Sequence, residues 1–501
     1  MNQLSYQTLE NINYSGFLLK SGKDKILQFG EGNFLRAFAD DFIDIANERA
    51  GFDAKVTIIQ PIPQGLTDLI NRQDGLYTLY LRGSDRGTAV NEKRLISAVR
   101  QCLNPYEDWQ SVLNAARGTD LEYVISNTTE AGIAYVPGCA FSDTPPVSFP
   151  AKLTRVLYER FSAGLPGLVI LSCELIDNNG KELLKCVDRY CEDWALSDDF
   201  KRWLHEDCLF CSTLVDRIVP GRIRDAAERD RLNQENGYID ELMDVGEYFG
   251  VWIIEGPAEL EDRLPFKRAG LPVQVVPDVT PYKMRKVRIL NGAHTGFVPG
   301  AWLAGFSIVR DCVKNDVIRS FMNQMLYEEV IPTLPLPKAD VSAFAEAVQD
   351  RFLNPFVDHA LLSITLNSVS KWKARNLPSL LAYTKQFGKL PPCLSTSFAA
   401  LLAFYNSSIG ALTQSGLCAV RPDGTAYTIQ DDRNVLEFFF AHRADTVESL
   451  TNAAMANSAF WDMDLREIPG FYNETVRILK LIKAEGVIPA FQAASRCAAD
   501  V

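Results

Sequence analysis

The sequence predicts an α/β N-terminal domain followed by a mostly α-helical C-terminal domain. In the first half, short apolar runs that stop at glycine or proline alternate with stretches that carry apolar residues at helical spacing. Continuous apolar strands separated by helices are typical of a parallel sheet that is covered on both faces. In the second half only the helical spacing continues. The change falls at the proline-containing stretch 276–281, so we expect domains of residues 1–278 and 279–501.

The elements of the first half follow in order along the chain. The expected strands share unbroken apolar or β-branched runs, and they cover residues 25–30, 54–61, 121–130 and 167–176. The expected helices repeat apolar residues every three or four positions, and they cover residues 33–49 and 150–163. In the second half the same helical repeat covers residues 317–331, 342–353, 354–364, 394–412, 435–443 and 474–486.

The composition indicates a globular protein without a general affinity for nucleic acid or membranes. The 501 residues are 47% hydrophobic and carry 51 basic against 63 acidic side chains, a net charge of −12. Such a chain is a poor partner for a polyanion, although a local basic pocket for a small anion stays possible. We expect no signal peptide and no membrane span, because no apolar run reaches about 20 residues. The 11 scattered cysteines fit reduced thiols in a cytoplasmic protein, and the sequence leaves monomer and dimer open.

One cluster, His205, Cys208 and Cys211 in "HEDCLFC", contains the ligand types that zinc prefers. A structural zinc site usually takes four ligands, and no second close cysteine pair accompanies this one. We therefore expect no metal and interpret the cluster as buried thiols beside a surface histidine. A zinc site stays the alternative.

A glycine turn lies between the first expected strand and the helix after it. In "LQFGEGNFLRA", Gly30 can make the tight turn, and Gly32 lets backbone N–H groups approach a pyrophosphate. The third glycine of the dinucleotide fingerprint is absent, because Leu35 stands at that position. A purely structural turn is the alternative, but the position between a strand and an amphipathic helix favours a cofactor loop.

The end of the second expected strand bears on which dinucleotide would bind. An acidic residue there binds the adenosine ribose of NAD in many such domains, whereas this chain has Gln60. Glutamine can still hydrogen-bond a ribose hydroxyl, and no arginine follows closely that would attract a 2′-phosphate. We therefore favour NAD over NADP.

A basic segment opens the second half with "PYKMRKVRILNGAHTGF", which contains one of the four histidines. In a regular α-helix, His294 lies about 80° and Asn291 about 140° around the axis from Lys286, so the three project from one side. Reduction of a carbonyl needs a proton donor and dipoles for the developing alkoxide, which lysine and asparagine can supply. A neutral histidine can orient a substrate hydroxyl. The alternative is a solvated basic face with a buried histidine. We expect Lys283, Arg285 and Arg288 to form the solvated or structural part of this basic helix.

Five segments in order resemble the mannitol dehydrogenase family of polyol-specific long-chain dehydrogenases. Lys286, Asn291 and His294 match its K-x₄-N-x₂-H signature. "FGEGNFLRAF" resembles its G-x-G-x-F-x-R-A cofactor loop, and "SNTTEAGIAY" its T-x-T-E-x-G-Y segment. "FPAKLTRVLYERF" resembles its F-P-A-K-L-T helix, and "VDRIVPG" its V-D-R-I-x-P turn. The resemblance runs from about residue 25 to 480.

The resemblance implies a Rossmann-type first domain, a helical second domain and metal-independent hydride transfer. It implies Lys286 as general acid/base, Asn291 as a donor to the oxyanion and His294 as a ligand of a substrate hydroxyl. Asp216 of "VDRIVPG" matches a residue that lines the family's substrate site. The expected cofactor-binding residues are Phe29, Gly30, Gly32, Asn33, Phe34, Arg36, Gln60, Asn127, Thr129 and Glu130.

The chain departs from the family's S-C-D-N segment, whose asparagine helps to hold the oxyanion. Here "SCELIDNNG" places Glu174 and Leu175 at those positions, which puts a polyol substrate in doubt. The segments "CELIDNNG" and "ILNGAHT" resemble the family's hexuronate branch more closely than its polyol branch. That likeness implies an NAD-dependent enzyme of hexuronate catabolism that interconverts D-altronate and D-tagaturonate.

A sugar-acid substrate demands a cation for its carboxylate. The stretch "LNSVSKWKARNLP" lies where the family has substrate-binding basic residues, and it contains Lys371, Lys373 and Arg375. Lys371 and Arg375 are four residues apart and share a helical face, so we expect these two to bind the substrate. A solvated basic face is the alternative.

Three other functions stay open at this point. Two are the reduction of D-fructuronate to D-mannonate and a mannitol-type polyol dehydrogenase. The third is a non-catalytic module that senses a nucleotide or a sugar acid.

Overall fold

The computed structural model describes residues 1–129 and 131–496, which fall into two compact units. The first unit comprises Met1–Gly83 and Val90–Val279, and the second comprises Ser84–Ala89 and Thr280–Val501. No helix of the described part combines the length and apolarity that a membrane crossing requires.

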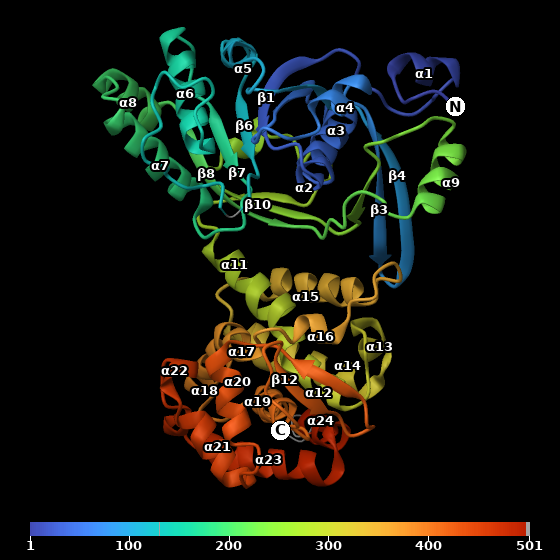
Figure 1. Cartoon of the computed structure of the whole chain (residues 1–501), viewed down its shortest axis with the longest axis vertical. Helices are drawn as coiled ribbons and strands as arrows, with labels where there is room; N and C mark the ends of the chain where they lie inside the picture. Colours follow the sequence, from blue (N-terminus) through green and yellow to red (C-terminus); the bar gives the residue numbers. More distant parts are fainter. Residues whose placement is uncertain (130, 497–501) are drawn as a thin grey trace. The chain divides into compact units, whose positions relative to one another are not determined.

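The first unit contains a sheet with strand order β11-β10-β8-β7-β6-β1-β2-β5 (Figure 1). The strands from β5 to β8 are parallel, and β10 pairs antiparallel with β8. This parallel order is that of a Rossmann fold, with the reversal of strand order between β1 and β6. The strands are β1 (Lys23–Phe29), β2 (Ala54–Ile59), β5 (Val99–Leu103), β6 (Tyr123–Ser126), β7 (Val169–Ser172), β8 (Leu209–Asp216), β10 (Val251–Glu255) and β11 (Val273–Val276).

Helices cover both faces of this sheet because its strands are apolar on both faces. One core joins β1, β2 and β6 to α3, and the other joins β1, β6 and β7 to α5, α6, α7 and α8. A three-stranded sheet of order β4-β3-β9 completes the unit, with β3 (Tyr77–Asp85), β4 (Thr88–Ile96) and β9 (Asp244–Glu247). The helices are α1 (Tyr6–Asn11), α2 (Asn33–Arg36), α3 (Ala39–Ala50), α4 (Thr67–Arg72), α5 (Trp109–Ala116), α6 (Phe149–Ser162), α7 (Asn179–Asp193), α8 (Asp198–Glu206), α9 (Ala226–Asn236) and α10 (Leu260–Arg263).

The helix expected over residues 33–49 is broken into α2 and α3. At the break, the Tyr77 hydroxyl donates to the carbonyl of Arg36 at 2.8 Å, and Arg217 Nη1 donates to the carbonyl of Ala37 at 2.6 Å. A continuous helix would use both carbonyls internally. The buried side-chain donors take them instead, so the chain can change direction at Phe38.

Within residues 280–496, the regular structure of the second unit is helical apart from one hairpin of β12 (Leu417–Val420) and β13 (Ala426–Ile429) (Figure 1). The α-helices are α11 (Thr280–Lys286), α12 (Gly292–Leu303), α13 (Val309–Lys314), α14 (Asp316–Gln324), α15 (Lys338–Phe352), α16 (Leu361–Ile364), α17 (Ser368–Arg375), α18 (Leu377–Phe387), α19 (Pro392–Tyr405), α20 (Arg433–Ala441), α21 (Val447–Ala456), α22 (Ser458–Trp461), α23 (Phe471–Glu485) and α24 (Val487–Arg496). Two π-helices, η1 (Val287–Asn291) and η2 (Met325–Val330), and two 3₁₀ turns, η3 (Ile331–Thr333) and η4 (Leu465–Glu467), complete it.

The helix expected over residues 354–364 forms only at its end, as α16. Pro355 opens this stretch, and the Asn354 side chain accepts the N–H of Phe356 at 2.9 Å, which holds the segment in a turn. The prediction of a helix from Asn354 to Ala360 was therefore wrong.

Glu329 of η2 is a buried carboxyl that caps another helix. It accepts the backbone N–H groups of Cys393 at 2.7 Å and Leu394 at 2.8 Å, at the start of α19. Burial raises its pKa from 4.5 to about 7, although these two N–H groups act in the opposite direction. The folded chain therefore holds the Glu329 proton over a pH range in which the unfolded chain has lost it.

We expect the replacement Glu329→Gln to flatten the pH dependence of stability between about pH 4.5 and 7. Because the pKa of Glu329 is raised in the folded chain, its contribution to the free energy of unfolding is largest at low pH. That contribution falls by about 3 kcal/mol as the pH rises across this window. The melting temperature of the variant relative to wild type should thus increase from pH 5 to pH 8. Glu328→Gln, at the exposed neighbouring position, is the matched control. A constant difference across this range would contradict the assignment.

Candidate active site

Gly30 follows β1 in a conformation that only glycine adopts easily. Its φ is +126°, and a Cβ at this position would lie 3.0 Å from the carbonyl oxygen of Asn127 and 3.3 Å from Leu35. Asn127 follows β6, the neighbour of β1 at the point where the strand order reverses. The turn therefore lies at the edge of the sheet where doubly wound folds bind their ligands.

Gly32 has a different reason to be glycine. Its φ is −64°, which any residue adopts, and a Cβ there would meet no described atom within 4 Å. Neither backbone strain nor packing within the described chain requires glycine at this position. A group that approaches the backbone from outside the chain would require it, as the pyrophosphate of a dinucleotide does.

This contrast predicts opposite effects for two alanine variants. Gly32→Ala should leave the melting temperature within about 2 °C of wild type and raise the KM for the dinucleotide at least about tenfold. Gly30→Ala should lower the melting temperature because the added methyl group is strained and crowded. Thermal unfolding and steady-state kinetics of both variants test this. Unchanged cofactor kinetics in Gly32→Ala would contradict a cofactor role for the turn.

Several predicted cofactor residues face the protein interior. Phe29 is fully buried and packs on Phe149, with ring centroids 5.0 Å apart. Gln60 donates from Nε2 to the carbonyls of Ile62 and Pro63, and its Oε1 accepts the Thr67 hydroxyl at 2.8 Å. The amide of Gln60 thus shapes the loop after β2 instead of presenting a free group to a ribose.

The remaining cofactor candidates lie around the turn and after β6. Asn33 accepts a hydrogen bond from the fully buried Arg36, and Phe34 stacks on Phe38 with centroids 5.1 Å apart. Asn127 Nδ2 donates to the carbonyl of Cys173 at 2.6 Å. Two further candidates follow, of which Thr129 has a φ of +72° and Glu130 lies outside the described residues.

Glu174, which departs from the family pattern, supports the loop after β6. It accepts the hydroxyl of Ser126, and the N–H and hydroxyl of Thr128, each at 3.1 Å. Burial raises the pKa of this carboxyl. The next residue, Leu175, is 64% exposed and offers no hydrogen-bonding side chain. No pattern in the sequence signals that Glu174 holds this loop in place.

Lys286 directly precedes the π-helix η1, and Asn291 is its last residue. Lys286 ends α11, and Gly292 begins α12. A π-helix bonds residues five apart, so residues at this spacing lie near one full turn from each other. The two side chains therefore project closer to one side than the about 140° of a regular α-helix would allow. Single π-turns of this kind occur frequently at functional sites.

His294 lies in α12 among aromatic rings and cations. Its ring is 4.2 Å from that of Phe352 and 5.3 Å from that of His359, while its Nε2 is buried without a hydrogen-bond partner in the described part of the chain. Burial lowers the pKa of His294 well below 6.5, and His359, Arg351, Arg375 and Lys371 lower it further. The imidazole is therefore neutral at physiological pH and keeps an open ring nitrogen.

The helix α17 brings basic residues to the same region of the second unit. Arg375 Nη1 donates to the Thr295 hydroxyl at 3.1 Å, next to His294, and the Arg375 carbonyl would lie 3.7 Å from a Cβ at Gly292. Lys371 Nζ donates to the carbonyl of Ile364 at 3.0 Å. Lys373 instead forms an ion pair with Asp462 at 2.8 Å. Of the three basic residues, Arg375 and Lys371 therefore act near His294, whereas Lys373 is directed toward Asp462.

His359 and Arg351, two residues that act on His294, were not predicted from the sequence. Their own sequence context has no motif, and only the folding of α15 and the segment before α16 brings them near α12. Of the two roles expected for Arg285, solvated or structural, the structure supports the structural one, because Arg285 is buried and its guanidinium lies 4.4 Å from the Phe344 ring centroid. Arg288 is partly buried, and burial lowers its pKa.

Asp216 ends β8 in the first unit and is 7% exposed. The following residue, Arg217, forms a buried ion pair with Asp41 at 2.8 Å. Asp216 thus lies at the carboxyl end of a parallel strand, on the edge of the sheet that also carries Gly30.

The three residues weighed as a zinc cluster do not all lie on one face of the sheet. His205 binds Asp188 at 2.8 Å, Cys208 packs in one core of the first unit, and Cys211 packs in the other. Within residues 1–129 and 131–496, no three His, Cys, Asp or Glu side chains lie close enough together to hold a metal ion.

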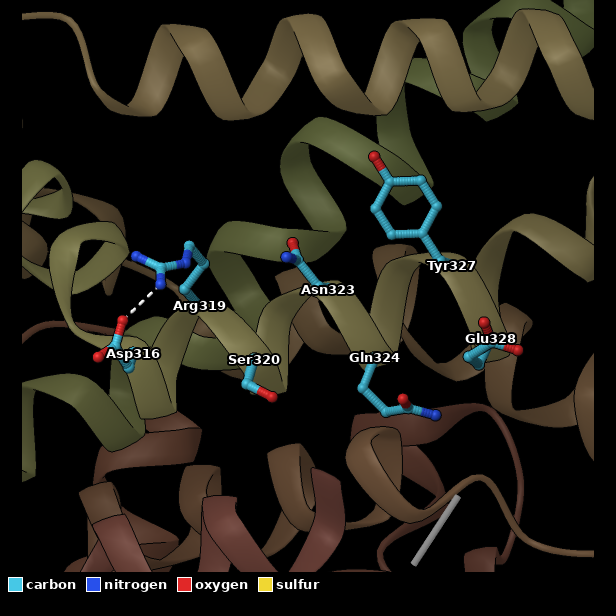
Figure 2. A pocket seen from close by; sticks show the side chains of 7 residues that line it. All are labelled: Asp316, Arg319, Ser320, Asn323, Gln324, Tyr327 and Glu328. Atoms are coloured by element: carbon cyan, nitrogen blue, oxygen red, sulfur yellow. Dashed lines mark hydrogen bonds and ion pairs between the residues drawn. The ribbon is translucent and has the colours of Figure 1, made fainter. Parts of the chain in front are cut away.

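An open groove elsewhere in the second unit contains none of the predicted residues. It follows one face of α14 and η2 and is lined by polar side chains, which Figure 2 shows projecting from successive turns. Arg319 and Asp316 form an ion pair there, and Tyr327 Oη accepts a hydrogen bond from Gln349 at 3.1 Å. The face lacks the lysine, asparagine and histidine of the candidate site.

The Rossmann sheet with its glycine turn and the Lys–Asn–His segment of the helical unit define a dehydrogenase. The model of the mannitol dehydrogenase Rossmann domain matches residues 24–268, and that of the mannitol dehydrogenase C-terminal domain matches residues 278–483. The chain belongs to the mannitol dehydrogenase family.

Relatives match over almost the full length. The altronate oxidoreductase of Yersinia enterocolitica is 43% identical over 97% of this chain and 100% of its own. That of Klebsiella pneumoniae is 42% identical over 94% of this chain and 96% of its own.

Two solved structures share the fold. A substrate-free D-sorbitol dehydrogenase superimposes with a TM-score of 0.79 at 22% identity, covering 98% of this chain and 100% of that one. The mannitol 2-dehydrogenase of Pseudomonas fluorescens, in complex with NAD and D-mannitol, has a TM-score of 0.64 at 21% identity and covers 99% of each chain.

Proposed function

We propose that this protein is an NAD-dependent oxidoreductase that interconverts D-altronate and D-tagaturonate. The observation that carries the proposal is the contact of Arg375 with Thr295, which places a guanidinium beside the neutral His294. A carboxylate-bearing sugar needs such a cation, whereas a neutral polyol does not. The full-length similarity to altronate oxidoreductases supports the same substrate.

The two units divide the work. The first, expected as residues 1–278, holds the dinucleotide at the turn Gly30–Asn33, where a Cβ at Gly32 would meet no described atom within 4 Å and the backbone is open to a pyrophosphate. Bound there, NADH supplies the hydride that reduces the substrate carbonyl. The loop after β2, "PIPQGL", carries no arginine or lysine for a 2′-phosphate, which supports NAD over NADP. The second, expected as residues 279–501, supplies the groups that handle the proton and the sugar acid.

Lys286 gives its proton to the carbonyl oxygen as the hydride reaches the carbonyl carbon. The C=O bond becomes C–O–H, the lysine is left neutral, and it regains a proton from water. The Asn291 amide donates to the same oxygen and stabilises its developing negative charge. His294, neutral and with an open ring nitrogen, orients a hydroxyl of the sugar. In the oxidative direction each proton moves the opposite way.

Lys371 and Arg375 bind the carboxylate, and Asp216 binds a sugar hydroxyl. The exposed Leu175 adds only apolar surface where polyol enzymes of the family carry an asparagine donor. We also place the protein in the cytoplasm, because the cysteines of its described residues are free thiols.

The direct test is an activity panel with NADH and NADPH. The proposal predicts NADH-dependent reduction of D-tagaturonate to D-altronate, with much lower activity on D-fructuronate and D-fructose. A preference for D-fructose would indicate a mannitol-type enzyme, and a preference for D-fructuronate would indicate formation of D-mannonate. Nucleotide binding without turnover of any of these sugars would indicate a sensing module.

A further inference from the structure

Arg36 is a fully buried arginine whose N–H groups are directed at the glycine turn. Nε donates to the carbonyl of Glu31 at 3.2 Å, and Nη2 donates to Oδ1 of Asn33 at 2.7 Å. Nη1 donates to the carbonyl of Leu242 at 2.7 Å, just before β9. One guanidinium thus connects two points of the turn with a segment 206 residues away.

Asp244 balances the buried charge of Arg36. The two side chains are both 0% exposed, and Arg36 Nη2 lies 3.2 Å from Asp244 Oδ2. Burial raises the pKa of Asp244 to about 6, and Arg36 opposes that rise. The carboxylate is therefore ionised at pH 7.5, and Asp244 Oδ1 accepts the N–H of Val245 at 2.9 Å. A buried arginine without such a partner would be strongly destabilising.

The backbone on the far side of the turn is fixed as well. The Tyr77 hydroxyl holds the carbonyl of Arg36, and Arg217 holds the carbonyl of Ala37, at the break between α2 and α3. Arg217 is itself paired with Asp41 in the first turn of α3. The turn is therefore fastened at Glu31 and Asn33 by Arg36, and its exit is fastened by Tyr77 and Arg217.

We propose that Arg36, balanced by Asp244, is a positioning residue that holds the turn Gly30–Asn33 in the shape that binds the dinucleotide. Arg36 does not touch the cofactor, because its side chain is 0% exposed. It acts through the Glu31 carbonyl and the Asn33 side chain, which set the direction of the backbone at Gly32. The inference rests on the proposed binding of NAD at this turn.

Three variants separate positioning from stability: Arg36→Met, Asp244→Asn and the double variant. The single variants each leave one buried charge unpaired, so both should lower the melting temperature. The double variant removes both charges and should recover most of that loss, because a buried ion pair can often be replaced by neutral groups at little cost. It still lacks the bonds to Glu31 and Asn33, so its KM and dissociation constant for NADH should stay at least tenfold above wild type. Its kcat should stay within about twofold.

Arg160→Met is the matched control for loss of a buried arginine. Arg160 is 1% exposed and donates to the carbonyls of Pro166, Ala116, Gly118 and Leu121, which precede strands of the same sheet at its opposite edge. This variant should lose stability without a change in NADH affinity.

Fluorescence titration with NADH in the absence of sugar gives the decisive readout. If wild type and the double variant bind NADH equally, Arg36 only stabilises the fold and the inference is wrong, whereas the proposed function stands. If wild type itself does not bind NADH, the proposed function and the inference both fail. Tenfold weaker binding in the double variant, with the Arg160→Met control unchanged, supports the inference.

Discussion

Replacement of Lys286 by alanine is expected to lower kcat about 10³-fold for the reduction of D-tagaturonate, with little change in the dissociation constant of NADH. A positioned general acid contributes about 10²- to 10⁴-fold to such a step, and alanine has no proton to give. Lys286 is partly exposed at the end of α11, so the fold should tolerate its loss. Single-turnover rates and NADH titration of the same preparation measure the two effects.

Two controls accompany this prediction. Lys283→Ala removes a lysine from the same helix, three residues earlier, and should retain near-wild-type kcat. Added methylamine or ethylamine should restore part of the activity of Lys286→Ala, because a small amine can enter the space of the lost side chain and donate the proton. Full activity of Lys286→Ala without added amine would remove the lysine from the mechanism.

Replacement of Arg375 by methionine is expected to raise the KM for D-tagaturonate about 10- to 100-fold and to leave the KM for NADH unchanged. A hydrogen bond to a charged group contributes about 1.5–3 kcal/mol, and tenfold in affinity corresponds to about 1.4 kcal/mol. Methionine keeps much of the apolar stem of arginine, so the packing of α17 on α12 is retained.

Lys373→Met is the matched control for this variant, because Lys373 lies on the same helix but pairs with Asp462. It removes one positive charge from α17 and should leave the KM for the sugar acid within about twofold of wild type. Equal effects of the two variants would indicate a general effect of charge and would contradict a specific role for Arg375.

The glycine turn shows what local sequence can predict. The sequence predicted a tight turn at Gly30, between a strand and a helix. The φ of +126° at Gly30 and its closeness to Asn127 agree with that prediction. The strand runs were equally readable, because a strand covered on both faces has to be apolar throughout. The predicted Rossmann sheet and helical second half are confirmed by the structure and by the matched family models.

Other features depend on partners far along the chain. Arg36 belongs to a motif that resembles a cofactor loop, but its acceptor at Leu242 is 206 residues away, so the motif alone could not show that the side chain is buried. Gln60 likewise had the position of a ribose ligand, and the loop that captures its amide could not be read from the strand. His359 reaches His294 only through tertiary folding.

The π-helix η1 has the largest consequence among the features that the sequence did not reveal. Residues 287–291 contain neither proline nor glycine, and their apolar pattern fits an α-helix equally well. The extra residue per turn depends on packing in the folded chain. The π-helix brings the Asn291 side chain nearer to the side of the helix that carries Lys286. In a regular α-helix the two side chains would lie about 140° apart around the axis.

The proposed substrate requires that this dehydrogenase recognise the carboxylate of a sugar acid. The most direct measurement compares kcat/KM for D-tagaturonate and D-tagatose with NADH, because D-tagatose has a hydroxymethyl group in place of the carboxylate. We predict that D-tagaturonate is preferred by about 10²- to 10⁴-fold, the equivalent of two charge-assisted hydrogen bonds of about 1.5–3 kcal/mol each. Equal values, or a preference for D-tagatose, would contradict the claim.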